Sequence, residues 1–70
     1  MNDYRTTYRK AMTRAARNAG VWVDAKRVDG LRAAKASCAY LRRTYPAYDW
    51  SYWLKPGETV VNCRLKKEGN

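Results

Sequence analysis

The sequence contains no histidine, the side chain that most often serves as a general base or metal ligand near neutral pH. Its only cysteines are Cys38 and Cys63, which form no Cys-x-x-Cys pair, so a structural zinc site is not expected. One pair of cysteines is also no disulfide framework. We interpret both as small buried apolar residues, with a bridge between them as the alternative.

Catalytic and phosphate-binding motifs are absent as well. The four glycines stand at positions 20, 30, 57 and 69 and form no phosphate-binding loop. The six acidic residues are scattered along the chain, whereas paired acid–base catalysis needs two of them close in space. We therefore expect no cofactor, no metal and no catalytic residue, which favours a binding protein over an enzyme.

Long hydrophobic runs are also missing. No segment approaches the roughly 18 apolar residues of a membrane span, and the N-terminal segment lacks the apolar run of a signal peptide. A cytoplasmic protein that does not insert into membranes is expected. A surface-bound first helix is the weaker alternative, because its apolar stripe is mostly Ala and Tyr.

Positive charge and aromatic rings are abundant. With 15 Lys and Arg against 6 Asp and Glu, the chain has a formal net charge of +9, which attracts polyanions such as nucleic acid or an acidic protein surface. Three Trp and six Tyr are too many for a disordered tail. The 70 residues predict one small basic domain over 1–70, with a frayed C-terminus at 66–70.

The first predicted element is a helix over 3–19. Asn2 or Asp3 can cap its start, and Gly20 can end it in a left-handed conformation. Apolar residues recur at helical spacing and form one stripe. The stripe contains Tyr4, Tyr8, Ala11, Met12, Ala15 and Ala19.

A short strand over 21–25 and a second helix over 28–45 follow. Alternation predicts the strand, and Lys26 with Arg27 is expected to turn the chain after it. The helix has a buried seam at spacings of three and four residues, and Pro46 prevents its continuation. The seam contains Leu31, Ala34, Cys38, Leu41 and Tyr45.

Two alternating segments, 50–55 and 59–67, predict a β-hairpin around Pro56 and Gly57. Symmetric pairing would set Tyr52 opposite Val61, Trp50 opposite Cys63 and Asp49 opposite Arg64. The expected core face contains Trp50, Tyr52, Leu54, Val61, Cys63 and Leu65.

The element order α-β-α-β-β predicts an α+β fold, namely a small three-stranded antiparallel sheet with two helices packed on it. Placing the last strand between the other two gives a split β-α-β arrangement. Two layers are favoured because the chain is short. In the alternative, the first helix covers the opposite face of the sheet.

The candidate binding residues are mainly cations on the two helices. The first helix has no acidic residue after Asp3, whereas a merely solvated face usually mixes both signs. Several Arg and Lys on one helix can neutralise several phosphates. The candidates are Arg5, Arg9, Lys10, Arg14 and Arg17 on the first helix, Arg32, Lys35, Arg42 and Arg43 on the second, and Arg64 and Lys66 on the last strand.

The segment from Tyr40 to Trp53 interleaves six aromatic residues with two arginines. This composition suits stacking on single-stranded nucleic acid, and it equally suits a protein-binding hot spot. Part of it is expected to be core, namely Tyr45, Trp50 and Tyr52. Tyr48 and Trp53 are the candidate surface groups.

We expect a non-enzymatic protein that contacts nucleic acid or a nucleoprotein complex, as a monomer or weak dimer, without sequence-specific base readout. The motifs of helix-turn-helix, zinc-finger and RNA-recognition domains are absent. The alternative is an inhibitor or adaptor that binds an acidic protein or a ribonucleoprotein directly. In size, charge and β-α-β-β core the chain resembles small phage-encoded proteins that block host polymerase or CRISPR complexes, which implies such direct contact.

Overall fold

The computed structural model describes residues 4–66, without the side chains of residues 4 and 5. The elements follow the predicted order α-β-α-β-β. The predicted helix cap at Asn2 or Asp3, and most of the predicted frayed C-terminus, lie outside the described residues. The elements are α1 (Tyr4–Arg17), β1 (Val23–Val28), α2 (Leu31–Thr44), β2 (Tyr48–Lys55) and β3 (Glu58–Leu65).

The sheet has β3 in its centre, in the order β1-β3-β2, and both neighbouring pairs are antiparallel. This confirms the predicted split β-α-β arrangement. The predicted hairpin register is also confirmed, because Trp50 pairs with Cys63 and Tyr52 pairs with Val61. Since side chains alternate along a strand, these four residues point to one face of the sheet.

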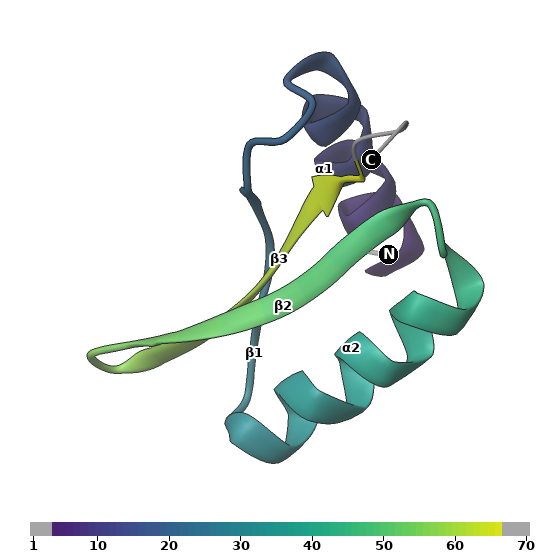
Figure 1. The fold of residues 1–70 in the computed structure, drawn as a ribbon. Coiled ribbons are helices and arrows are strands. Elements are labelled where there is room, and N and C mark those ends of the chain that lie inside the picture. Colours follow the sequence, from purple (N-terminus) through teal and green to yellow (C-terminus); the bar gives the residue numbers. More distant parts are fainter. Residues whose placement is uncertain (1–3, 67–70) are drawn as a thin grey trace.

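Both helices cover this same face, and Trp50 shows it most directly. The Tyr8 ring of α1 meets the Trp50 ring edge-to-face, with centroids 5.9 Å apart and planes at 83°. At the other end of the indole, Nε1 donates a hydrogen bond of 3.2 Å to the carbonyl of Tyr45, just after α2. The domain therefore has the favoured two layers, with α1 over β1 and β3 and α2 over β2 and β3 (Figure 1).

The core lies between these two layers. It confirms most of the predicted helical stripe and seam, although Ala19 lies beyond α1 and is exposed. The apolar faces meet because burying them is the main favourable contribution in so short a chain. The buried cluster contains Tyr8, Ala11, Met12, Ala15, Ala34, Cys38, Leu41, Trp50, Val61 and Cys63.

The first strand differs from its prediction. It runs from Val23 to Val28, and Lys26 and Arg27 pair with β3 instead of turning the chain. The register shifts between Asp24 and Lys26, which is a bulge that interrupts simple alternation. The prediction over 21–25 was wrong because it followed that alternation and stopped where the bulge begins.

The second helix begins at Leu31 and not at 28. Gly30, with φ 96° and ψ 173°, cannot belong to a helix, so the chain turns there. Leu31 is the first helical residue and is exposed, so its predicted place in the buried seam was wrong. The helix ends at Thr44, before Pro46, and its other seam residues are buried or half-buried.

Leu54 was also predicted in the core and is exposed. It lies next to the hairpin turn, and the hairpin end projects beyond both helices (Figure 1). Nothing in the helical layer therefore reaches it. At the other end of the sheet, Gly20 has φ 89° and follows α1 as predicted, although the helix itself ends at Arg17.

Both cysteines are buried and free, which confirms that they act as small apolar residues. Burial raises the pKa of the Cys63 thiol to about 11, although the nearby Arg14 guanidinium acts in the opposite direction. Over the described part of the chain, neither helix has the length and apolar character needed to cross a lipid bilayer.

Candidate nucleic-acid interface

The charges of the protein separate by structural layer. Helices α1 and α2 contain nine of the 15 Lys and Arg residues and none of the six Asp and Glu residues. The rest of the chain has six residues of each sign and is neutral. Because both helices cover one face of the sheet, the whole net charge of +9 belongs to the helical layer.

The cations of α1 point away from the core. The helix buries the side that contains Tyr8 and Met12, and its Arg and Lys side chains are exposed on the other side. Within residues 4–66, none of these side chains forms an ion pair. Their charge is therefore available to an external anion. The exposed cations are Arg9, Lys10, Arg14 and Arg17.

Helix α2 adds four more cations, which are also exposed. Arg32, Lys35 and Arg43 make no ion pair among the described residues. Arg42 differs, because its Nη2 donates a hydrogen bond of 3.0 Å to the backbone carbonyl of Trp50. Arg42 therefore ties the end of α2 to β2. All four were predicted from the sequence.

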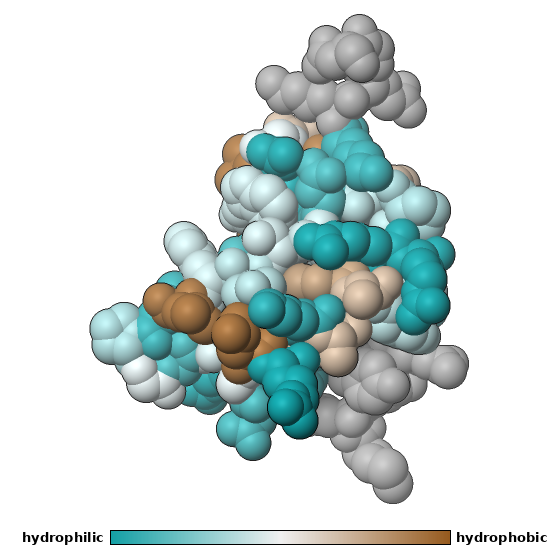
Figure 2. Space-filling model, turned by 60° about the horizontal axis from the view of Figure 1, so that its bottom comes forward, coloured by the Kyte–Doolittle hydropathy of each residue, from teal (hydrophilic) through white to brown (hydrophobic). Residues whose placement is uncertain are grey.

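A groove of about 310 Å³ lies in the helical layer. Tyr8 of α1, Lys26 of β1 and Tyr40 of α2 line it, together with Ala36, Ser37 and Leu41. Lys26 was not a predicted binding residue, because it was assigned to a turn. On the face that Figure 2 shows, hydrophobic side chains form small groups separated by hydrophilic ones. This face therefore offers charge rather than a continuous apolar surface.

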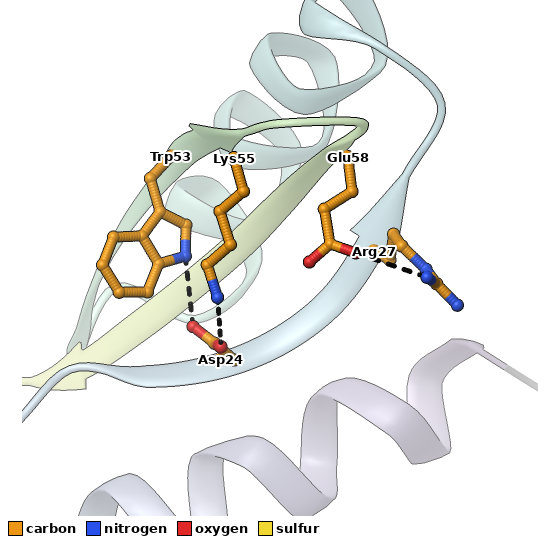
Figure 3. Close-up of polar contacts among 5 residues, drawn as sticks. All are labelled: Asp24, Arg27, Trp53, Lys55 and Glu58. Atoms are coloured by element: carbon orange, nitrogen blue, oxygen red, sulfur yellow. Dashed lines mark hydrogen bonds and ion pairs between the residues drawn. The ribbon is translucent and has the colours of Figure 1, made fainter.

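In contrast, the cations of the sheet are largely neutralised. Acidic partners on the face opposite the helices hold three of them, two of which appear in Figure 3. Exposed pairs of this kind contribute little stability, at most about 1 kcal/mol each. The ion pairs are Arg27–Glu58 at 3.3 Å, Lys55–Asp24 at 3.5 Å and Arg64–Asp49 at 2.8 Å.

Trp53 lies on this open face of the sheet, as the sequence predicted, and no helix covers it. It is 47% exposed, and its Nε1 donates a hydrogen bond of 3.2 Å to Oδ1 of Asp24. Figure 3 shows the ring of Trp53 and the ammonium of Lys55 reaching from β2 toward Asp24 on β1. Lys55 Nζ lies 4.6 Å from the ring centroid.

Trp22 is the aromatic residue that the sequence reasoning missed. It is 40% exposed, and the Arg64 guanidinium carbon lies 4.6 Å from its ring centroid. The alternation of residues 21–25 predicted that Trp22 points away from the core, and the alternation of the hairpin predicted the same for Trp53 and Arg64. The sequence did not show that these three residues share one surface, because this depends on the central position of β3.

Tyr48 does not lie free at the surface as predicted. Its side chain is half-buried and packs against the core, with its ring centroid 6.2 Å from that of Trp50. Its hydroxyl donates a hydrogen bond of 3.3 Å to the carbonyl of Met12 in α1. The prediction failed because Trp50, two residues away, anchors this face of β2 in the core. Tyr48 is therefore held partly in the core, although it also lines a hollow together with Arg42 and Arg64.

Comparison with models of protein families, with curated proteins and with solved structures finds no match. Over residues 4–66, no three Cys, Asp or Glu residues lie close enough together to hold a metal ion.

Two predicted binding residues remain. The side chain of Arg5 lies outside the part of the chain that the structure describes. Lys66 is exposed at the end of β3, in the same hollow as Arg64.

Proposed function

We propose that this protein is a non-enzymatic, cytoplasmic nucleic-acid-binding protein that contacts the phosphate backbone through its helical layer. The nucleic acid is either free or part of a nucleoprotein complex. The observation that supports this proposal is the separation of charge: nine cations and no acid on two helices, both on the same side of a sheet whose charges nearly cancel.

Binding of this kind depends on neutralising phosphates and releasing their counterions, so affinity falls steeply with salt. The exposed cations of α1 and α2 lack intramolecular acid partners among the described residues, so no ion pair has to break before a phosphate binds. Neither helix presents a known base-reading motif. The proposed contact therefore positions the protein on the backbone and does not read sequence through the helices.

Titration against a labelled duplex and a labelled single strand, each at 50 and 200 mM salt, tests the proposal. The expected result is binding at low salt that weakens by at least about 10-fold at high salt, since several phosphate contacts are lost together. Weak binding that is independent of salt would contradict it. Comparing the affinities for the duplex and for the single strand also shows which form of nucleic acid the protein prefers.

A direct protein partner is the second candidate, and the exposed Trp22 and Trp53 favour it, since Trp and Arg are enriched in protein hot spots. In this case the protein is a small inhibitor or adaptor, of the phage type, on an acidic protein or ribonucleoprotein. Pull-down from a bacterial lysate with and without nuclease separates the candidates. A nucleic-acid-binding protein loses its captured material after nuclease treatment, whereas a protein-directed inhibitor keeps it.

A further inference from the structure

The open face of the sheet contains a hollow of about 280 Å³ that the helical layer does not use. Trp22 and Trp53 line it, together with Ser51, Tyr52 and Asn62 from the two strands of the hairpin. Ser51 and Asn62 are cross-strand partners, and Asp24 of β1 pairs with Asn62 on its other side. The hollow therefore combines aromatic rings with the side-chain amide of the central strand.

Asn62 is the unusual residue of this hollow. It is only 6% exposed, and its Oδ1 is buried without any hydrogen-bond partner among the described residues. Leaving a buried acceptor unpaired is unfavourable, and buried polar groups in proteins are nearly always satisfied. Asn62 lines the hollow between the indoles, but its Oδ1 has almost no exposed surface, so a ligand N–H group would reach and satisfy this oxygen once the neighbouring side chains move apart.

The shape of the surroundings suits a flat ligand. Trp53 extends from β2 across the central strand to Asp24, as Figure 3 shows, and this contact fixes the position of its ring. The guanidinium of Arg64 lies over one face of the Trp22 ring and the ammonium of Lys55 over one face of the Trp53 ring, so a base would stack on the other face or displace the cation. Exposed indoles held in this way are stacking platforms for planar bases, and every nucleobase combines a π face with an N–H donor at its edge.

A second hollow, of about 400 Å³, shares Trp22 with the first. Its walls include Arg42, Arg64 and Lys66. Arg64 is paired with Asp49, whereas Arg42 and Lys66 make no ion pair within residues 4–66. Because Arg42 belongs to α2, this cationic hollow connects the open face with the helical layer. Phosphates next to a bound base would meet these cations.

We infer that the open face binds one unpaired nucleobase of a single-stranded nucleic acid. The base stacks on Trp22 and Trp53 and donates an N–H hydrogen bond to Asn62, while the adjoining phosphates contact Arg42 and Lys66. This inference rests on the proposed function and deepens it, because it specifies single strands and adds a base contact to the backbone contacts. Stacking tolerates different bases, so the site does not require a particular sequence.

Affinity for a fluorescein-labelled 12-nucleotide single strand tests the site. Trp53→Ala and Trp22→Ala are each expected to weaken binding by about 5- to 150-fold, the range found for the loss of one base–aromatic stack. Trp53→Phe keeps a ring and is the matched control, with a loss of about 3-fold or less. Urea unfolding of each variant confirms that the fold is intact. Wild-type affinity in both Ala variants would overturn the inference.

An NMR titration separates failure of this site from failure of the proposed function. Adenosine 5′-monophosphate should saturably shift the Asn62 side-chain amide and the Trp53 indole N–H, whereas ribose 5-phosphate, which has no base, should leave both in place. If the wild type binds no oligonucleotide, the proposed function fails, but these shifts would still support a nucleobase site. If oligonucleotides bind and adenosine monophosphate shifts neither signal, the site is wrong and the helical interface stands.

Discussion

Asn62 and Cys63 are neighbours on the central strand, and both are buried, but they face opposite layers of the molecule. Cys63 packs under the helices as an apolar residue, whereas Asn62 lies beneath the indoles of the open face with a free acceptor. The sequence predicted Cys63 in the core. It gave no sign that Asn62 would be buried, because that burial depends on the central position of β3, where Asn62 lies between Asp24 of β1 and Ser51 of β2.

Asn62→Leu is predicted to leave the fold equally or more stable, by up to about 3 kcal/mol, because it removes a buried unpaired oxygen. Urea unfolding measures the change. Thr59→Val is the matched control, since Thr59 is buried on the same strand and has no such orphan atom. Asn62→Leu should also lose the response to adenosine monophosphate. A decrease of more than about 1 kcal/mol in the free energy of unfolding would show that the Asn62 amide has a structural role.

The Cys63 thiol is predicted to make stability depend on pH between about 9 and 11. Burial raises its pKa to about 11 in the folded protein, above its ordinary value of 9.0. In this window the unfolded chain has lost the proton and the folded chain has kept it, so the free energy of unfolding falls as pH rises. For one thiol, the free energy of unfolding can fall by at most about 1.4 kcal/mol per pH unit.

Urea unfolding at pH 8, 9.5 and 11 measures this dependence, with Cys63→Ala as the reference, because lysines and tyrosines titrate in the same range. The difference between the two proteins should grow smaller as pH rises. A constant difference across the range would mean that the thiol ionises equally well in the folded and unfolded states.

Among the elements, the hairpin was the most predictable and the junction between β1 and α2 the least. The turn at Pro56 and Gly57 fixes the register, and alternation on both strands agrees with it. At the junction, the bulge after Asp24 breaks the alternation, and Gly30 delays the helix. These are tertiary features: β1 is an edge strand whose pairing with β3 determines its extent, and no local pattern encodes that pairing.

Gly30→Ala is predicted to destabilise the protein by about 1 to 3 kcal/mol. With φ 96° and ψ 173°, Gly30 has a backbone conformation that only glycine adopts easily. An added Cβ would meet no atom within 4 Å, so the whole cost would come from backbone strain. Chemical unfolding measures it. Gly57→Asn is the comparison, because Asn tolerates a positive φ, and its cost should be smaller. Equal costs would refute this explanation.

At the scale of the whole molecule, the two layers have different properties. The helical layer has all of the net charge, and the open sheet face has ion pairs, two indoles and an orphan amide. Helical periodicity predicted the basic faces, because the cations of α1 lie mainly opposite its apolar stripe and those of α2 lie beside its buried seam. The aromatic site required the strand order, since it combines Trp22, just before β1, with residues of β2 and β3 that are distant in the sequence.

The salt dependence of binding tests the central claim, that the helical layer contacts phosphates, most directly. The variant replaces Arg9, Lys10, Arg14 and Arg17 with Gln. All four side chains are exposed and make no ion pair among the described residues, so the fold should persist. Arg27→Gln is the control, because Arg27 is exposed on the sheet and paired with Glu58.

Affinity for the 12-nucleotide single strand, measured from 50 to 300 mM salt, gives the slope of log K against log salt. Each lost phosphate contact reduces its steepness by about 0.7, so the fourfold variant should lose about 3 in slope and bind at least 100-fold more weakly at low salt. Arg27→Gln should change the slope by less than about 0.5. A fourfold variant with the wild-type slope and affinity would contradict the helical interface.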